Sequence, residues 1–258
     1  MLNKLITKLG YSLRKLDALN SFPYKKSYNS NNVKFDLWIA DETASEWYDK
    51  GFEDNKEELG IISSMLDSGD KVLEVGVHYG FFASFISAHV TKGKYLGIEM
   101  QPKAAMHAQA NLSLNEFPNA RIINSAGGRE SGEIDYVPNI NGNSAVSKGG
   151  NTGFKIPVLS IDEIISKEGQ MNFLKIDVEG HEIEVLKGAK NSLKNFSKIA
   201  IEIHNTMLSK AQIKELVELL SIEDFKGKMF IRPNYKLEEI DIEKIIHSPE
   251  IVNLFIWK

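Results

Sequence analysis

From residue 71 onward, short apolar runs alternate with stretches of helical spacing, and this rhythm restricts the chain to few folds. The first three apolar runs are residues 71–75, 95–99 and 120–124, and the helical stretches between them are residues 81–90 and 102–114. Parallel strands need such crossover helices. This part of the chain therefore predicts half of a doubly wound sheet.

The second half of the chain continues the pattern and ends it differently. Two further apolar runs, residues 172–177 and 199–204, are expected to be the fourth and fifth parallel strands. Helices are expected over residues 161–167, 179–193 and 209–220, and extended segments over residues 133–137 and 155–159. Residues 228–232 and 252–257 are predicted to pair antiparallel at the end of the sheet.

Composition excludes several classes of protein. The 258 residues include 31 Lys and Arg, 35 Asp and Glu and no cysteine, which gives a formal net charge of −4. Without cysteine there is no disulfide framework, no thiolate zinc site and no thiol nucleophile. The charge argues against nucleic-acid binding and favours a small-molecule or neutral partner. Assembly into a homo-oligomer is left open.

Residues 1–60 are expected to form a helical N-terminal extension, followed by a larger domain over residues 61–258. Leucines and basic residues share helical spacing over residues 1–19, which predicts a surface helix. Attachment to a membrane surface is the less favoured alternative. The sequence has no apolar run long enough for a signal peptide or a membrane span, so we expect a soluble, cytoplasmic protein.

A glycine-containing turn follows the first strand. Gly76 and Gly80 permit a tight turn and close approach of a ligand, and Glu74 offers a carboxylate beside them. Glu99 ends the next strand, where an acidic side chain of a nucleotide-binding fold takes the ribose hydroxyls. The Gly-x-Gly-x-x-Gly pattern is missing, since Ala83 stands three residues after Gly80. A nucleoside with a charged amino-acid tail is therefore favoured over NAD.

Several blocks of sequence resemble the FkbM-type S-adenosylmethionine-dependent methyltransferases. The most specific is Leu-Lys-Ile-Asp-Val-Glu-Gly-His-Glu at residues 174–182, and the others are residues 72–82, 99–102, 185–189 and 201–204. The resemblance implies a class I methyltransferase (Rossmann-like) α/β fold: a seven-stranded, mostly parallel sheet with a reversed last strand and helices on both faces. It also implies S-adenosylmethionine as the cofactor and methyl transfer to an oxygen, often a sugar hydroxyl.

The resemblance also implies cofactor contacts by position. Glu74, Gly76 and Gly80 are expected at the methionine end of the cofactor and Glu99 at its ribose. At the adenine, Met100 and Gln101 are expected on one edge, and Ser125 and Ala126 on the other side. Two further residues, His78 and Asp177, are also expected to contact the cofactor. The family commonly has Asp and Asn where this chain has Glu74 and His78. The contact at residue 78 is left open, because imidazole and amide differ in reach and donor number.

Catalysis is expected at the fourth strand, because open α/β sheets bind ligands outside the carboxyl ends of their strands. Methylating a hydroxyl requires a base to take its proton; His181 is the first choice and Asp177 the second. His204 ends the neighbouring strand beside Glu202 and is expected at the same rim. Glu179 is expected to contact the substrate, with capping of the following helix as the alternative.

The same donors could hold a divalent cation. They are Asp177, Glu179, His181, Glu202 and His204. The sequence does not determine whether these side chains converge. The metal ligands are therefore unknown at this stage, and a divalent cation is possible but not expected.

Residues 139–153 are rich in Asn, Gly and Ser and are predicted to form a lid, with Asn143 and Ser144 binding the acceptor. A solvated linker is the alternative. We expect O-methylation of a saccharide or glycosylated metabolite. The alternatives are a lipid, polyketide or peptide hydroxyl, or a non-catalytic module that only binds S-adenosylmethionine. The aromatic side chains that could stack on a sugar ring are Trp38, Trp47 and Tyr48.

Overall fold

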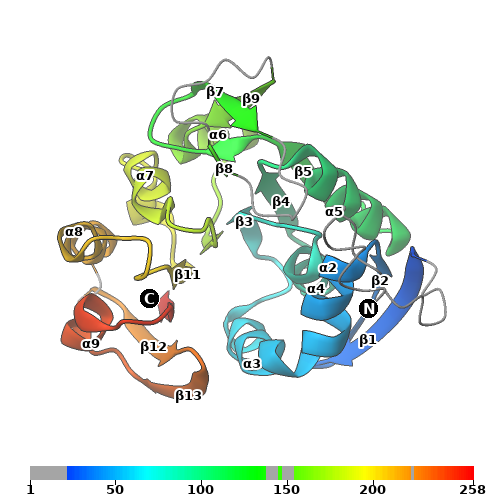
Figure 1. Cartoon of the computed structure of the whole chain (residues 1–258), viewed down its shortest axis with the longest axis horizontal. Helices are drawn as coiled ribbons and strands as arrows, with labels where there is room; N and C mark the ends of the chain where they lie inside the picture. The colour runs from blue at the N-terminus through cyan, green and yellow to red at the C-terminus, as the bar shows by residue number, and fades with distance from the viewer. Residues whose placement is uncertain (1–21, 138–144, 147–153, 222–223) are drawn as a thin grey trace, which may run out of the picture.

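The computed structural model describes residues 22–137, 145–146, 154–221 and 224–258. Its centre is a sheet of eight strands in the order β13-β12-β14-β11-β10-β3-β4-β5 (Figure 1). The strands are β3 (Lys71–Val75), β4 (Lys94–Glu99), β5 (Ala120–Asn124), β10 (Phe173–Ile176), β11 (Lys198–Ile203), β12 (Lys226–Ile231), β13 (Asn234–Glu239) and β14 (Val252–Trp257).

Five neighbouring strands pair in parallel, in the order β5, β4, β3, β10 and β11. The strand β14 runs antiparallel to both β11 and β12. The predicted mostly parallel sheet with a reversed last strand is therefore confirmed. An eighth strand, β13, pairs antiparallel with β12 and was not predicted. It forms the edge of the sheet beyond the seven expected strands.

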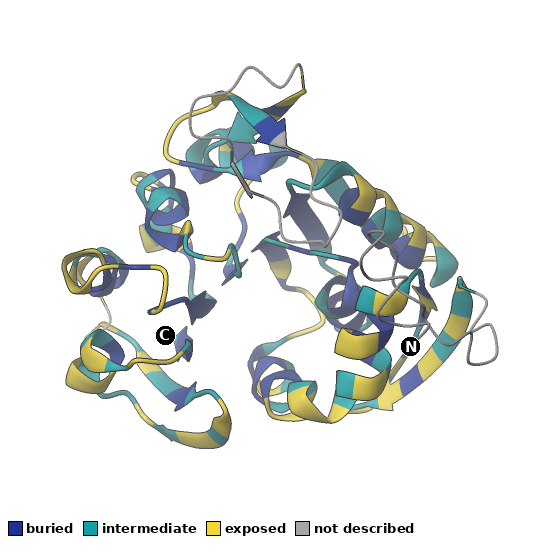
Figure 2. Cartoon of the chain, in the orientation of Figure 1, coloured by how far each residue is buried: buried dark blue, intermediate teal, exposed yellow. Residues whose placement is uncertain are grey.

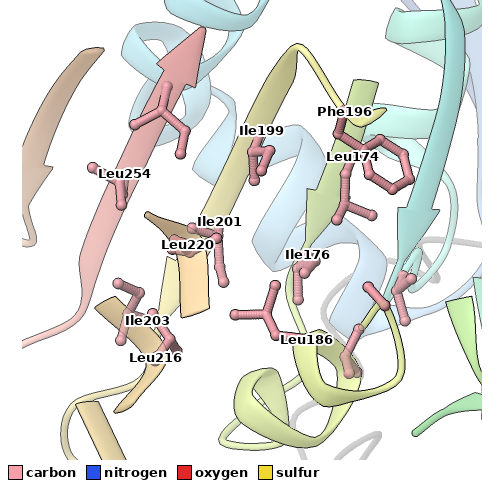
Figure 3. Close-up of a cluster of buried hydrophobic side chains, with 14 of the residues drawn as sticks. Leu174, Ile176, Leu186, Phe196, Ile199, Ile201, Ile203, Leu216, Leu220 and Leu254 are labelled. Atoms are coloured by element: carbon pink, nitrogen blue, oxygen red, sulfur yellow. The ribbon is translucent and has the colours of Figure 1, made fainter. Parts of the chain in front are cut away.

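Helices cover both faces of the sheet. One face carries α6 (Ile161–Glu168), α7 (Glu182–Lys187), α8 (Lys210–Leu220) and α9 (Ile242–His247); the other carries α3 (Lys56–Met65), α4 (Phe81–His89) and α5 (Pro102–Leu114). Alternate strand residues serve the two faces: Leu174 and Ile176 pack on the first (Figure 3), and Phe173 on the second. Buried residues accordingly concentrate on the strands and on the inner faces of the helices (Figure 2).

The helix α7 is shorter than expected. The sequence pattern predicted a helix over residues 179–193, but α7 spans only Glu182–Lys187. Glu179 and Gly180 both have positive φ (50° and 91°), which no α-helix accommodates. Glu179 and Gly180 therefore lie in a turn between β10 and α7 and not in the helix.

The N-terminal region differs from the predicted helical extension. β1 (Tyr24–Ser30) and β2 (Val33–Ile39) form an antiparallel hairpin, followed by α2 (Glu42–Ala44), a π-helical turn η1 (Ser45–Asp49), a 3-10 helix η2 (Lys50–Asn55) and α3. Phe35, Leu37 and Ile39 are buried against α4 while the residues between them are more exposed. This period-two burial is why the segment is a strand. The expected boundary at residue 60 falls inside α3, and residues 1–19 lie outside the described residues.

A second, small sheet lies beside the carboxyl end of β5. Its strands, in the order β6-β9-β7-β8, are β6 (Ala126–Gly127), β7 (Gly132–Val137), β8 (Ala145–Val146) and β9 (Lys155–Leu159). Asn143 and Ser144, the predicted acceptor contacts of the lid, lie outside the described residues. None of the helices that the structure describes is both long and apolar enough to cross a membrane.

Candidate active site

The turn after β3 is built by two glycines with different tasks. Gly76 has φ of +91°, and a β-carbon there would lie 1.6 Å from the carbonyl oxygen of Asp177. Gly80 has φ of +85°, and a β-carbon there would lie 2.8 Å from the α-carbon of Ala108 on α5. Gly76 therefore lets the ends of β3 and β10 approach each other. Gly80 allows close packing against α5, and its predicted contact with the cofactor remains a prediction.

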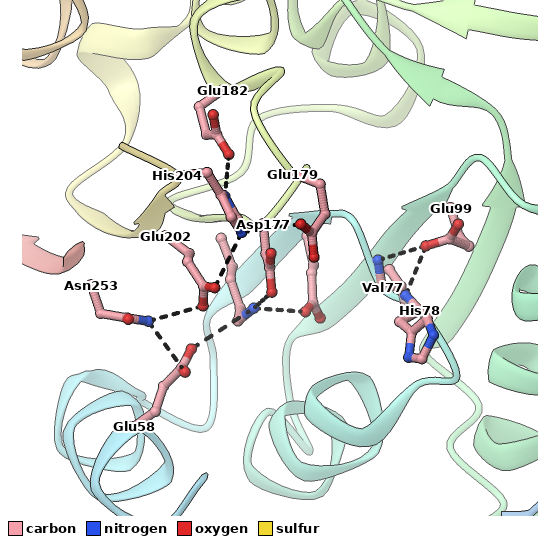
Figure 4. Close-up of polar contacts among 12 residues, drawn as sticks. Glu58, Val77, His78, Glu99, Asp177, Glu179, Glu182, Glu202, His204 and Asn253 are labelled. Carbon is pink, nitrogen blue, oxygen red and sulfur yellow. Dashed lines mark hydrogen bonds and ion pairs between the residues drawn. The ribbon is translucent and has the colours of Figure 1, made fainter. Parts of the chain in front are cut away.

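Glu99 holds this turn in place. Its carboxylate accepts hydrogen bonds from the backbone N–H groups of Val77 (3.1 Å) and His78 (2.7 Å) (Figure 4), and from that of Gln101 (2.7 Å). Burial raises the pKa of Glu99, and these three donors oppose the shift. A carboxylate has about four acceptor positions, so about one remains for a ribose hydroxyl. The ribose contact expected of Glu99 remains a prediction.

The residues expected around the adenine make mainly internal contacts. Gln101 is the residue before α5, and the backbone carbonyl of Met100 accepts a hydrogen bond from Asn124. The buried hydroxyl of Ser125 donates to the carbonyl of Pro157 (2.8 Å), which fastens the small sheet to β5. Ala126 begins β6. None of these four residues lines the cavity described next, and their predicted cofactor contacts remain predictions.

A cavity of about 290 Å³ opens at the carboxyl ends of β3, β10 and β11. Of the predicted site residues, the structure brings Glu74, Gly76, His78, Asp177 and Glu179 to its wall. Its other lining residues are Glu46, Trp47, Tyr48, Gly51, Asp54, Asn55, Val77, Phe82, Lys175, Glu202, Arg232 and Tyr235. Ligand pockets of enzymes begin at about this size.

Lys175 is the centre of the cavity wall and was not predicted. Its ammonium lies 3.3 Å from Glu74 and 3.9 Å from both Glu58 and Asp177, and it is almost fully buried. Burial raises the pKa of Glu74, and the charge of Lys175 opposes that shift. Tyr95 donates a second hydrogen bond to the same carboxylate. Glu74 is therefore committed to internal partners, so its predicted contact with the methionine end of the cofactor remains untested.

A second buried network lies on the β11 side. Arg232 and Asn253 both donate to Glu202, and each also lies 3.4 Å from Glu58. Burial raises the pKa of the Glu202 carboxyl, but His204 and Arg232 outweigh it and keep the pKa below its usual value. Glu58 lies on α3, and Arg232 directly follows β12. Neither follows one of the five expected parallel strands, where the sequence prediction looked for site residues. A charged residue on a largely apolar helix face was the available signal for Glu58.

His204 is held among three carboxylates. Its Nδ1 lies 2.6 Å from Oε1 of Glu182, and its Nε2 lies 3.3 Å from Glu202 and 3.5 Å from Glu179 (Figure 4). Burial lowers the pKa of His204, but the hydrogen bonds of Glu182 and Glu202 raise it to about 11. The imidazole is thus positively charged at neutral pH. This charge disfavours a role as general base.

Asp177 and His181 are placed differently. Burial raises the pKa of Asp177 to about 8, helped by Glu202 and opposed by Lys175. The Asp177 carboxylate faces the cavity. His181 is exposed, immediately precedes α7 and is not among the residues lining the cavity. The structure therefore brings the second candidate base to the cavity and leaves the first outside.

His78 has an unusual environment for a histidine. Its Nδ1 lies 2.5 Å from the hydroxyl of Tyr48, and its backbone has φ of +52°. Burial lowers its pKa to about 4, so the ring is neutral at physiological pH. Residue 78 therefore offers the cavity a neutral imidazole, fixed by Tyr48.

Comparisons with known proteins agree with this architecture. The model of the methyltransferase FkbM domain matches residues 74–231, which is more than half of the chain. The hexuronic acid methyltransferase AglP of Haloferax volcanii is 28% identical over 195 residues, covering 69% of this chain and 78% of that protein. The solved structure of methyltransferase FkbM from Methylobacillus flagellatus KT is similar with a TM-score of 0.50 and 18% identity, over 74% of this chain.

The chain spans only 44% of that solved protein, and a likeness at 18% identity shows the fold alone. The family match carries more weight, because residues 74–231 include the glycine turn, Lys175, Asp177 and His204. All the strand ends that form the cavity are inside the matched segment. With this turn, this sheet order and this match, the chain belongs to the FkbM methyltransferase family.

Proposed function

We propose that the protein transfers the methyl group of S-adenosylmethionine to a hydroxyl of a saccharide. Membership of the FkbM methyltransferase family supports the reaction class. The relative of known activity acts on a hexuronic acid, which supports a sugar as the acceptor. The observation that carries the proposal is the cavity at the carboxyl ends of β3, β10 and β11, with Asp177 on its wall. Open α/β sheets bind their ligands there.

The charge of the cavity fits the cofactor. Eight carboxylates and three cationic side chains belong to the described part of the cavity wall and the shell behind it. They are Glu46, Asp54, Glu58, Glu74, Asp177, Glu179, Glu182 and Glu202, against Lys175, His204 and Arg232. S-adenosylmethionine carries a sulfonium and an ammonium group, so an acid-rich wall suits it. Glu99 would hold the ribose on the other side of the turn.

When bound, S-adenosylmethionine supplies a methyl group on a positively charged sulfur, to which the acceptor oxygen bonds as the carbon–sulfur bond breaks and the hydroxyl loses its proton. Asp177 orients that hydroxyl and takes its proton at a carboxylate oxygen. Glu74 is bound to Lys175 and Tyr95, and Glu202 to Arg232, which leaves Asp177 more accessible than either. His181 lies outside the cavity lining and has no role in this proposal.

Aromatic side chains provide a surface for a sugar ring. Trp47 lines the cavity and its side chain is 53% exposed, and Tyr235 lines the cavity from the β13 strand. Flat, exposed aromatic rings bury large apolar areas when a ring with C–H groups stacks on them. Trp38, the other predicted candidate, lies on β2 and does not line the cavity. We assign Trp47 to the acceptor.

The test is methyl transfer by the purified full chain from tritium-labelled S-adenosylmethionine. The acceptors are uronic acids and neutral sugars, with lipid, peptide and polyketide hydroxyls as the competing classes. We expect transfer to a saccharide, and a loss of about 10²–10⁴-fold in kcat for Asp177→Asn. Glu184→Gln is the matched control, because Glu184 binds Arg129 outside the cavity.

Calorimetry with S-adenosylmethionine and S-adenosylhomocysteine separates the remaining alternatives. Binding of both without transfer to any acceptor would support a non-catalytic binding module. Faster transfer to a lipid or peptide hydroxyl than to any sugar would replace the saccharide with that class. Absence of binding by either compound would contradict the proposed cofactor.

A further inference from the structure

The buried pair of His204 and Glu182 fixes the direction of the imidazole ring. Glu182 is 0% exposed, accepts the backbone N–H of Gly180 at 2.9 Å, and lies 2.6 Å from Nδ1 of His204. With Nδ1 bound behind the site, Nε2 points toward the cavity, where Asp177, Glu179 and Glu202 converge (Figure 4). Metal-binding histidines typically have this arrangement, with the second ring nitrogen bound to a carboxylate.

Three donor atoms at this point, one of them on His204, have the spacing of a coordination sphere. One donor atom each from Asp177, Glu179 and His204 lie within 4.8 Å of one another. Ligands that bind one ion at 2.0–2.4 Å are separated by at most about 4–5 Å. The side chains come from two neighbouring strand ends, β10 and β11, and little movement would bring them onto one ion.

The cations near this cluster are already occupied. Lys175 is closest to Glu74 (3.3 Å) and only 3.9 Å from Asp177, and Arg232 binds Glu202. Glu179 has a side chain that is 58% exposed at the cavity rim, and among the described residues its ionic neighbour is His204. When Nε2 of His204 gives up its proton, the described side chains leave negative charge at the rim that a cation can neutralise.

We propose that Asp177, Glu179 and His204 bind a divalent cation at the rim of the cavity, with Glu182 orienting the imidazole from behind. The ion replaces the proton that Nε2 of His204 carries in its absence, so binding releases one proton to solvent. A mixed set of imidazole and carboxylate donors suits Mn²⁺ or Zn²⁺ better than Ca²⁺. This assignment differs from the sequence expectation, in which a cation was possible but not expected. It was unexpected because the sequence does not determine whether these side chains converge, and the buried pairing of His204 with Glu182 is visible only in the structure.

The role of the cation rests on the proposed function. A cation at the rim coordinates the acceptor hydroxyl and lowers its pKa, while the second oxygen of Asp177 accepts the hydroxyl proton. The acceptor oxygen then forms the bond to the methyl carbon, and the carbon–sulfur electron pair leaves with sulfur. The cation itself undergoes no redox change.

The test is titration of the full chain with Mn²⁺ alone, followed by electron paramagnetic resonance of the free ion. We expect one saturable site per chain. Glu179→Gln is the main variant, because this exposed side chain can change without disturbing the core, and it should weaken Mn²⁺ binding at least tenfold. Glu182→Gln tests the orienting role and should weaken binding by about 10–100-fold. Glu184→Gln, two residues further along α7, should leave it unchanged.

The absence of saturable Mn²⁺ binding would overturn the cation site. Equal weakening by Glu179→Gln and Glu184→Gln would also overturn it, because a diffuse acidic surface predicts that result. The proposed function fails separately. If methyl transfer continues in a chelator and Mn²⁺ does not bind, only the cation site is contradicted. If Mn²⁺ binds but no acceptor is methylated, only the methyltransferase proposal is contradicted.

Discussion

The α-carbon of Gly76 faces the carbonyl oxygen of Asp177 so closely that a β-carbon would lie 1.6 Å from that oxygen. The two residues end neighbouring strands, and the N–H of Asp177 donates to the carbonyl of Val75 at 2.9 Å. This contact sets the position of the Asp177 carboxylate relative to the glycine turn. Two walls of the cavity are thereby held together by backbone atoms.

Replacing this glycine should disrupt both walls. In Gly76→Ala the new methyl group meets a backbone oxygen, and φ of +91° is strained for alanine. We expect a loss of roughly 2–4 kcal/mol in unfolding free energy, measured with urea. Gly60→Ala is the control, because no atom lies within 4 Å of its β-carbon position in α3. It should be neutral or stabilising by up to about 1 kcal/mol. Equal stability of the two variants would contradict this account.

Lys175 should stabilise the buried acids of the cavity wall. Lys175→Met removes the cation that faces Glu74 and Glu58, which leaves uncompensated buried carboxylates. The expected cost is about 3–5 kcal/mol in unfolding free energy at pH 7. Lys167→Met is the control, since the exposed Lys167 pairs with Glu163 on the surface of α6 and its loss should cost at most about 1 kcal/mol. The interpretation fails if the two variants unfold at the same urea concentration.

Much of the fold could be predicted because its strands are continuous apolar runs between turn residues. The FkbM family and the class I sheet are both confirmed. The hairpin was missed although Phe35, Leu37 and Ile39 alternate with polar or exposed residues. Period-two patterns this short are ambiguous until the core that they pack against is known.

Site residues could be predicted where they directly follow a strand. They were missed where their role depends on contacts with residues distant in sequence. Asp177 and Glu179 were found because they follow β10 directly. Lys175 lies within that strand, and its significance depends on Glu58, a residue of α3 that the strand pattern could not relate to it. His181 was the first choice of base, but the turn at Gly180 places it directly before α7, where it is exposed and outside the cavity lining.

Trp47 should contribute to acceptor binding and not to cofactor binding. Trp47→Ala removes an exposed ring from the cavity wall, so we expect the KM of the sugar acceptor to rise by up to about tenfold. The dissociation constant of S-adenosylmethionine, measured by calorimetry, should stay within about twofold. Trp38→Ala is the matched control, because Trp38 is 38% exposed on β2 and lies outside the cavity lining. A similar rise in KM for both variants would exclude stacking at Trp47.

Glu168 should make the stability of the sheet depend on pH. Hydrogen bonds from Arg121 on β5 and Lys94 on β4 lower the pKa of Glu168 to about 2. A carboxyl group with a pKa lower in the folded than in the unfolded state, where it is about 4.3, stabilises the fold above that value. This contribution is lost as the pH falls from about 5 toward 2. At pH 7 we expect Glu168→Gln to cost about 1 kcal/mol, because the side chain is partly exposed.

The difference in unfolding free energy between the wild type and Glu168→Gln, measured with urea, should therefore shrink between pH 5 and about pH 3. Glu250→Gln is the control, because this exposed residue precedes β14, far from Lys94 and Arg121 in sequence, and should leave stability unchanged at each pH. If the difference in unfolding free energy between the wild type and Glu168→Gln stays constant from pH 7 to about pH 3, the two cations do not hold Glu168 ionised. The link between the α6 end and the β4–β5 edge would then have to rest on packing alone, through residues such as Ile161 and Ile164.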